Sequence, residues 1–198
     1  IVLNNNLSYT ISDDLRQRID KGEDIIVAPV GRDIELQFPI KEIIDHYNAN
    51  SGSLAVVNSL SFDIPAEKIT NDYGIQPPKD LLLILSDKKE DFFLRSELNN
   101  NVTSFYASYD SANRRYRFSG MREYLLEMLK KTDITPEDYT FTLTPVNIET
   151  ETNTSNSYYG SSTTYVSAIN PYIGAPTMVK LDIPKSKITL TFSKQTLD

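Results

Sequence analysis

One short apolar run constrains this chain more than any other feature. Five aliphatic residues stand in a row from Leu81 to Leu85, after Pro77-Pro78 and before the charged residues 87–91. Such a run has no polar face to offer water, and the two prolines oppose a helix entering it. The segment is therefore predicted to be a strand buried on both faces, with the rest of the chain supplying the layers that cover it.

Other segments alternate apolar and polar residues with the period of two that indicates a half-buried strand. They are 34–38, 60–64 (stopped by Pro65), 140–144 with its threonines outward, 179–183 and 188–192, together with a predicted hairpin of 103–109 and 114–118. Three stretches, 12–22, 40–47 and 121–131, have the apolar spacing of amphipathic helices. The pattern predicts one mainly β domain over 1–198, with 1–24 as a helical lead-in. We expect a β-sandwich with Greek-key or jelly-roll crossings and about three short peripheral helices.

A polar stretch near the C-terminus is predicted to be a mobile surface loop, 149–170. Its first part is almost entirely Glu, Thr, Asn, Ser, Tyr and Gly, and buries little apolar surface. Four tyrosines lie in or beside it: Tyr158, Tyr159, Tyr165 and Tyr172. Exposed tyrosines among small polar residues are typical of sugar-stacking or paratope-like surfaces, which makes them a candidate ligand contact. The alternative is that these tyrosines pack against the rest of the domain and hold the loop in place.

Composition argues against several classes of function. A net charge of −7 disfavours nucleic acid, whose binding depends on neutralising phosphates. The single histidine, His46, lies off the apolar stripe of 40–47, and there is no cysteine, so neither a metal site nor a cofactor site is predicted. No pair of carboxylates stands out among the 27 acidic residues, and we expect no enzyme. A glycan-active enzyme on a jelly-roll scaffold is the alternative, by analogy of fold alone.

Three arginines mark the second strand of the predicted hairpin: Arg114, Arg115 and Arg117. Strand alternation places Arg115 and Arg117 on one face, opposite Tyr116 and Phe118. The simplest interpretation is a solvated face over a core face, with an anion site as the alternative.

The ends and hydropathy of the chain bear on its compartment. No apolar run approaches the length of about 18 residues that would span a membrane. The chain opens with Ile1-Val2-Leu3 and not with an initiator methionine. We therefore expect that an export signal has been removed.

The order of these motifs resembles a known family over residues 30–195. The motifs are Leu36-Gln37-Phe38-Pro39, Leu60-Ser61-Phe62-Asp63-Ile64-Pro65, the run from Pro77 to Leu83, Tyr116-Arg117-Phe118-Ser119, Phe141-Thr142-Leu143-Thr144-Pro145 and Val179-Lys180-Leu181-Asp182-Ile183. This order resembles the DUF4270 family of Bacteroidetes cell-envelope lipoproteins, although the Ala-Glu that usually begins the family's Ile-Pro strand is absent. The resemblance implies export, an outer-membrane lipid anchor that this chain lacks, and no catalytic residues.

Two expectations follow from that resemblance. Asp110-Ser111-Ala112 resembles the O-glycosylation acceptor of the phylum, and its place in a turn would make Ser111 accessible. The chain as a whole is expected to be a non-catalytic extracytoplasmic domain that binds an envelope protein or glycan, or that acts structurally.

Overall fold

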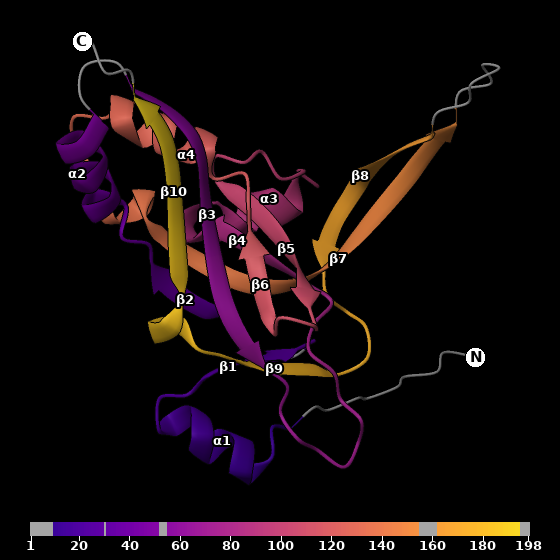
Figure 1. Cartoon of the computed structure of the whole chain (residues 1–198). Coiled ribbons are helices and arrows are strands. Elements are labelled where there is room, and N and C mark those ends of the chain that lie inside the picture. The colour runs from indigo at the N-terminus through magenta and orange to yellow at the C-terminus, as the bar shows by residue number, and fades with distance from the viewer. Residues whose placement is uncertain (1–9, 30, 52–54, 155–161, 195–198) are drawn as a thin grey trace.

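The computed structural model describes residues 10–29, 31–51, 55–154 and 162–194, which form ten strands and four α-helices (Figure 1). In chain order they are α1 (Asp13–Asp20), β1 (Asp24–Ala28), β2 (Ile34–Gln37), α2 (Ile40–Ser51), β3 (Ala55–Glu67), β4 (Asp80–Leu85), α3 (Lys89–Leu94), β5 (Ser104–Asp110), β6 (Arg115–Phe118), α4 (Arg122–Lys130), β7 (Thr140–Thr154), β8 (Ser162–Pro171), β9 (Thr177–Leu181) and β10 (Lys187–Lys194). The predicted mainly β, sandwich-like class is confirmed, with four described helices where about three were expected.

All the described strands pair antiparallel in one sheet. Its order is β1-β9-β3-β6-β5-β4-β7-β2, with β10 added to β3 and β8 to β7. The two ends of this order approach each other, because Val27 in β1 and Arg32 before β2 donate backbone hydrogen bonds to each other's carbonyl oxygens at 3.4 and 3.1 Å. The sheet therefore curls until its inner face encloses a single large core.

Strand β4 occupies the middle of this sheet, between β5 and β7. Leu81, Leu83 and Leu85 join the large inner core, whereas Leu82 and Ile84 join a second apolar cluster on the outer face. Helix α3 and the end of β8 contribute side chains to that second cluster. The predicted strand buried on both faces is confirmed.

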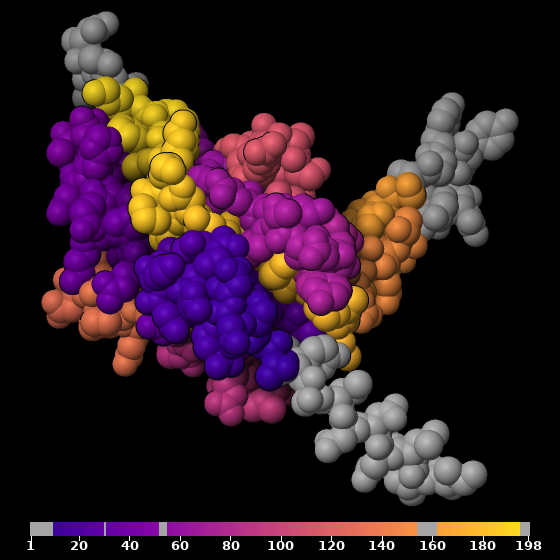
Figure 2. Space-filling view, turned by 90° about the horizontal axis from the view of Figure 1, so that it is seen from below, coloured from indigo at the N-terminus to yellow at the C-terminus, as the bar shows by residue number. Residues whose placement is uncertain are grey.

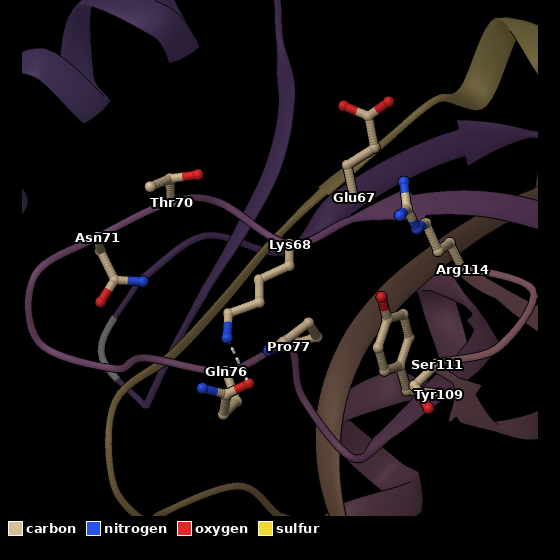
Figure 3. Close-up of a pocket in the computed structure, with 9 residues that line it drawn as sticks. All are labelled: Glu67, Lys68, Thr70, Asn71, Gln76, Pro77, Tyr109, Ser111 and Arg114. Carbon is tan, nitrogen blue, oxygen red and sulfur yellow. Dashed lines mark hydrogen bonds between the residues drawn. The ribbon is translucent and has the colours of Figure 1, made fainter.

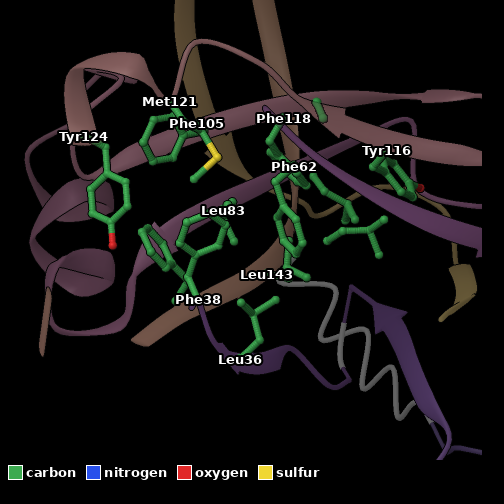
Figure 4. Close-up of a cluster of buried hydrophobic side chains, with 14 of the residues drawn as sticks. Leu36, Phe38, Phe62, Leu83, Phe105, Tyr116, Phe118, Met121, Tyr124 and Leu143 are labelled. Carbon is green, nitrogen blue, oxygen red and sulfur yellow. The ribbon is translucent and has the colours of Figure 1, made fainter. Parts of the chain in front are cut away.

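Aromatic rings fill the inner core beside α4 (Figure 4). The ring of Phe38 lies 5.4 Å from that of Phe62, 5.9 Å from that of Tyr124 and 6.1 Å from that of Phe141, centroid to centroid. All three contacts are edge-on, the geometry that brings the positive rim of one ring against the negative face of another. Phe38 thereby joins the segment before α2 to strands β3 and β7 and to α4.

Two details of the strand predictions were wrong. Thr142 and Thr144 are buried instead of solvated, because the outer face of β4 and β7 is itself covered; the hydroxyl oxygen of Thr142 lies 2.8 Å from that of Ser86. Strand β3 does not stop at Pro65 but continues to Glu67. Proline lacks an N–H, but its carbonyl oxygen can still accept, and that of Pro65 accepts from the backbone N–H of Asp182 at 2.9 Å.

The predicted mobile loop over 149–170 was also wrong for the described residues. Strands β7 and β8 pair along 146–154 and 162–171, and the two views show them as an arm that projects from the body (Figure 1, Figure 2). Threonine hydroxyls meet across the arm, with 2.9 Å between the Oγ1 atoms of Thr152 and Thr164. Polar composition pointed to a loop, but the Thr, Val and Tyr content also favours strands. Residues 155–161 lie outside the described residues.

The helical lead-in is confirmed as far as it is described. Helix α1 begins after Ser12, whose hydroxyl accepts a hydrogen bond from the backbone N–H of Leu15 at 3.3 Å, and Gly22 follows its end with φ +89°. Acidic residues at 13 and 14 stabilise the positive end of the helix dipole.

The Asp138 carboxylate ties the turn before β7 to α4, and its replacement has a predictable pH dependence. It accepts hydrogen bonds from Lys131 Nζ at 2.5 Å and from the backbone N–H of Thr135 at 3.0 Å. Burial acts to raise the pKa of Asp138, but these hydrogen bonds outweigh it and leave the pKa below its ordinary value of 3.8. Asp138→Asn is expected to lower the free energy of unfolding by about 1–3 kcal/mol at neutral pH in urea denaturation.

A depressed pKa stabilises the fold above the unfolded-state value and ceases to do so as pH falls through the folded-state value. The difference between the wild type and D138N should therefore shrink below about pH 4. Asp133→Asn, at an exposed neighbouring position, is the control and should be near neutral at both pH values. A difference for D138N that stayed constant down to acid pH would contradict the assignment.

Candidate functional site

An open cleft of about 800 Å³ lies between the loop that joins β3 to β4 and the turn that joins β5 to β6 (Figure 3). We call it the polar cleft. Its lining residues are Glu67, Lys68, Thr70, Asn71, Gln76 and Pro77 from the first segment and Tyr109, Ser111 and Arg114 from the second. Because β3 pairs with β6, the two segments meet at one edge of the sheet.

The amide of Asn71 shapes the loop on one side of the cleft. Its Nδ2 donates to the carbonyl oxygens of Ile69 and Ile75 at 2.9 and 3.1 Å, and its Oδ1 accepts from the backbone N–H groups of Tyr73 and Ile75 at 3.1 and 2.8 Å. An asparagine side chain can donate and accept at once, so one residue replaces the hydrogen bonds that a helix or strand would supply. The loop therefore has a defined shape without regular secondary structure.

Gln76 anchors the same side of the cleft to the sheet. Its Oε1 accepts a hydrogen bond from Lys68 Nζ at 2.8 Å, and its backbone carbonyl accepts from the N–H of Met178 in β9 at 3.1 Å. The lysine ammonium is thereby held over the cleft while two of its three donors remain for other partners.

A tight turn forms the opposite side. The Asp110 carboxylate accepts from the side-chain and backbone nitrogens of Asn113 at 2.6 and 3.0 Å, and these bonds lower the pKa of Asp110. Arg114 follows with φ +52°, in the left-handed region that non-glycine residues rarely adopt. Figure 3 shows the side chains of Tyr109, Ser111 and Arg114 on this side, across from Lys68 and Gln76.

The half-buried Tyr109 ring is supported from behind. It packs against the buried ring of Tyr116 with 5.3 Å between centroids, and the Tyr116 hydroxyl donates to the carbonyl oxygen of Pro78 at 2.5 Å. Burial raises the pKa of Tyr116 above its ordinary value of 10, so the hydroxyl stays protonated and donating. The aromatic surface of the cleft is therefore held in a fixed position.

The groups that converge on the cleft are chemically mixed. They comprise an aromatic ring, a guanidinium, an ammonium, hydroxyls, amides and one carboxylate, Glu67. A ligand rich in hydroxyl groups could pair with these donors and acceptors and lay an apolar face on Tyr109. Hydrolysis of a glycosidic bond uses two carboxylates, and the lining supplies one.

The predicted tyrosines do not gather into one surface. Tyr165 lies on β8, where its hydroxyl donates to Glu151 at 2.8 Å, and Tyr172 follows the strand, where its hydroxyl donates to the carbonyl oxygen of Ala175 at 2.7 Å. The two tyrosines are seven positions apart along an extended segment, which corresponds to about 23 Å. Neither lines the polar cleft, and Tyr158 and Tyr159 lie outside the described residues.

Ser111 lies exposed in the β5–β6 turn, as expected, and it also lines the polar cleft. Its glycosylation stays a prediction. The other lining residues were missed, although the sequence Asn71-Asp72-Tyr73-Gly74 indicates a turn, and Gly74 has φ +67°. No local signal places that turn against the β5–β6 hairpin.

Titratable side chains outside the polar cleft either form ion pairs or lie apart from one another. Two of the acids that follow β4 form ion pairs, with 2.8 Å between Asp87 and Lys88 and 3.4 Å between Asp91 and Arg95. Lys89 from the same segment pairs with Asp33, which precedes β2. His46 is exposed on α2, as predicted. Within the described ranges, no group of three or more His, Cys, Asp or Glu side chains is arranged to hold a metal ion. None of the helices in that part of the chain has the length and apolarity to cross a membrane.

Comparison with known proteins gave no match to a family model, to a curated protein or to a solved structure. The resemblance to the DUF4270 family stays a prediction that rests on the order of sequence motifs.

Proposed function

We propose that this chain is a non-catalytic, extracytoplasmic domain of a cell-envelope lipoprotein and that its polar cleft binds an envelope glycan. The observation that carries the binding proposal is the convergence of Tyr109, Arg114 and Lys68 on one open cleft of about 800 Å³. The outer-membrane location and the lipid anchor rest on the motif order that resembles the DUF4270 family.

The character of the lining favours a sugar over an apolar ligand. Apolar ligands would cover Lys68, Glu67 and Arg114 without replacing their hydrogen bonds to water, which costs free energy for each group. A sugar offers hydroxyls to these groups and a C–H face to the ring of Tyr109. The lone carboxylate of the lining supports binding without hydrolysis.

The test is a glycan array of envelope oligosaccharides followed by calorimetry on the best hit. Tyr109→Ala is expected to weaken binding about tenfold or more, because it removes the stacking surface. Arg114→Asn removes the guanidinium but keeps a residue that tolerates the left-handed backbone, and it too should weaken binding. Tyr165→Ala, on the projecting arm, is the matched control and should bind as the wild type does.

Circular dichroism and thermal unfolding of each variant separate lost binding from lost fold. A blank array with folded protein, or unchanged affinity in Y109A and R114N, would refute the binding proposal. Mass spectrometry of the glycan after incubation with the protein tests whether the domain is non-catalytic. Cleavage of the glycan that disappears in Glu67→Gln would show an enzyme.

A further inference from the structure

A second cavity, of about 440 Å³, opens on the outer face of β10, β3 and β6. We call it the basic pocket. Four cations line it, Arg115, Arg117, Lys185 and Lys187, with Asp63 as the single carboxylate; Pro65, Asn113 and Thr189 complete the lining. This local excess of positive charge stands in a chain whose net charge is −7. The pocket shares no lining residue with the polar cleft.

The sheet register places the cations around Asp63. Lys187 of β10 is the partner of Asp63 in β3, and Asp63 is in turn the partner of Arg117 in β6. Directly paired residues point to the same face, and adjacent strands lie about 4.8 Å apart, so the three side chains form one row. Arg115 precedes Arg117 by two residues and joins the same face.

Asp63 does not satisfy the cations that surround it. Its Oδ1 lies 3.1 Å from Arg115 Nη1 and its Oδ2 lies 3.8 Å from Arg117 Nη1, so two guanidinium groups share one carboxylate. Asp63 Oδ1 and Arg115 Nε are buried, and neither has a hydrogen-bond partner among the described residues. The 3.1 Å contact is thus close enough for charge attraction but poorly aligned for a hydrogen bond.

The remaining charges leave the pocket positive. Arg115 Nε also lies 3.7 Å from Asp110, and Lys185 pairs with Asp182 at 2.8 Å. Lys187 forms no ion pair with any residue that the structure describes. Arg117 is half exposed, and its Nη2 donates a long hydrogen bond of 3.4 Å to Ser61 Oγ. A guanidinium carries five N–H donors, so Arg117 keeps donors for a ligand.

We propose that the basic pocket is a binding site for a phosphate group, carried either by a small phosphorylated molecule or by the headgroup of an anionic lipid. Arginine presents a planar fork that matches two phosphate oxygens, and lysine adds a compact positive charge. Arg117 and Lys187 flank the buried Asp63 and can engage oxygens of one phosphate from both sides, while Arg115 holds Asp63 in place. The site goes beyond the proposed glycan cleft and stands independently of it.

The test follows the arginine Nε–Hε and backbone amide NMR signals during titration with inorganic phosphate at constant ionic strength, with chloride as the replaced anion. Saturable shifts at Arg115 and Arg117 are expected. The double variant Arg117→Gln, Lys187→Gln should lose at least tenfold in affinity; both side chains reach solvent, so the fold should persist, as thermal unfolding will show. Lys79→Gln is the matched control, because Lys79 is 86% exposed and lines neither pocket; it should bind phosphate as the wild type does.

Vesicle sedimentation separates the two sources of the phosphate. Phosphatidylglycerol vesicles that retain the wild type but not the double variant, with no retention on phosphatidylcholine, would assign a lipid headgroup. Phosphate binding without vesicle retention would assign a small phosphorylated ligand. Shifts that follow ionic strength alone, or phosphate and vesicle binding that the double variant leaves unchanged, would overturn the proposal.

Discussion

Replacing Leu83 with alanine is expected to lower the free energy of unfolding by about 3–5 kcal/mol. Leu83 is fully buried at the centre of β4, where it pairs with Phe105 of β5 on one side and Leu143 of β7 on the other. β5 and β7 are hydrogen-bonded to β4 on either side and cannot move in to fill the space left by the leucine side chain. The lost contacts and the residual cavity therefore both lower the free energy of unfolding. Urea denaturation at neutral pH measures the change.

The matched control is Leu94→Ala at the end of α3, where the leucine is 74% exposed. This variant should differ from the wild type by no more than about 0.5 kcal/mol. A cost below about 1 kcal/mol for L83A, or equal costs at the two positions, would mean that β4 does not lie inside the core.

Phe38→Ala should have an effect of similar size, about 3–5 kcal/mol, for a different reason. Phe38 is only 1% exposed and makes edge-on contacts with three other rings, those of Phe62, Tyr124 and Phe141. Its replacement removes these aromatic pairs, each worth about 0.5–1.5 kcal/mol beyond buried area, and leaves a cavity. Near-ultraviolet circular dichroism should weaken while the strand signal remains, and chemical denaturation gives the free energy.

The aromatic control for this variant is Tyr73→Ala, because the Tyr73 ring is 88% exposed on the β3–β4 loop. It should leave stability nearly unchanged. If F38A unfolded at the same denaturant concentration as Y73A, the ring cluster could not be the feature that joins α4 to the sheet.

The short strand β6 links the core to both proposed sites. Tyr116 and Phe118 point into the inner core, and Arg115 and Arg117 line the basic pocket. Arg114, immediately before the strand, lines the polar cleft. The split of this strand into a core face and a charged face agrees with the sequence prediction. The two sites are therefore positioned by one rigid element, which gives both a fixed geometry.

Sequence by itself determined the features that depend on near neighbours along the chain. The apolar run of β4, the alternation of β2 and β6, the apolar stripe of α2 and the Ser12 cap of α1 were all predictable, because each is a repeating local pattern. The same local signals misassigned 149–170, because polar composition describes solvent exposure and not backbone pairing.

Only the tertiary structure decided which strands lie next to one another. The pairing of β3 with β6, β9 and β10 sets Asp63 between Lys187 and Arg117 and brings the β3–β4 loop against the β5–β6 turn. The covering of β7 by α3 and β8 buries Thr142 and Thr144. Strand alternation states which face a residue occupies, but neighbours across a sheet come from contacts between segments distant along the chain, and no local pattern encodes those.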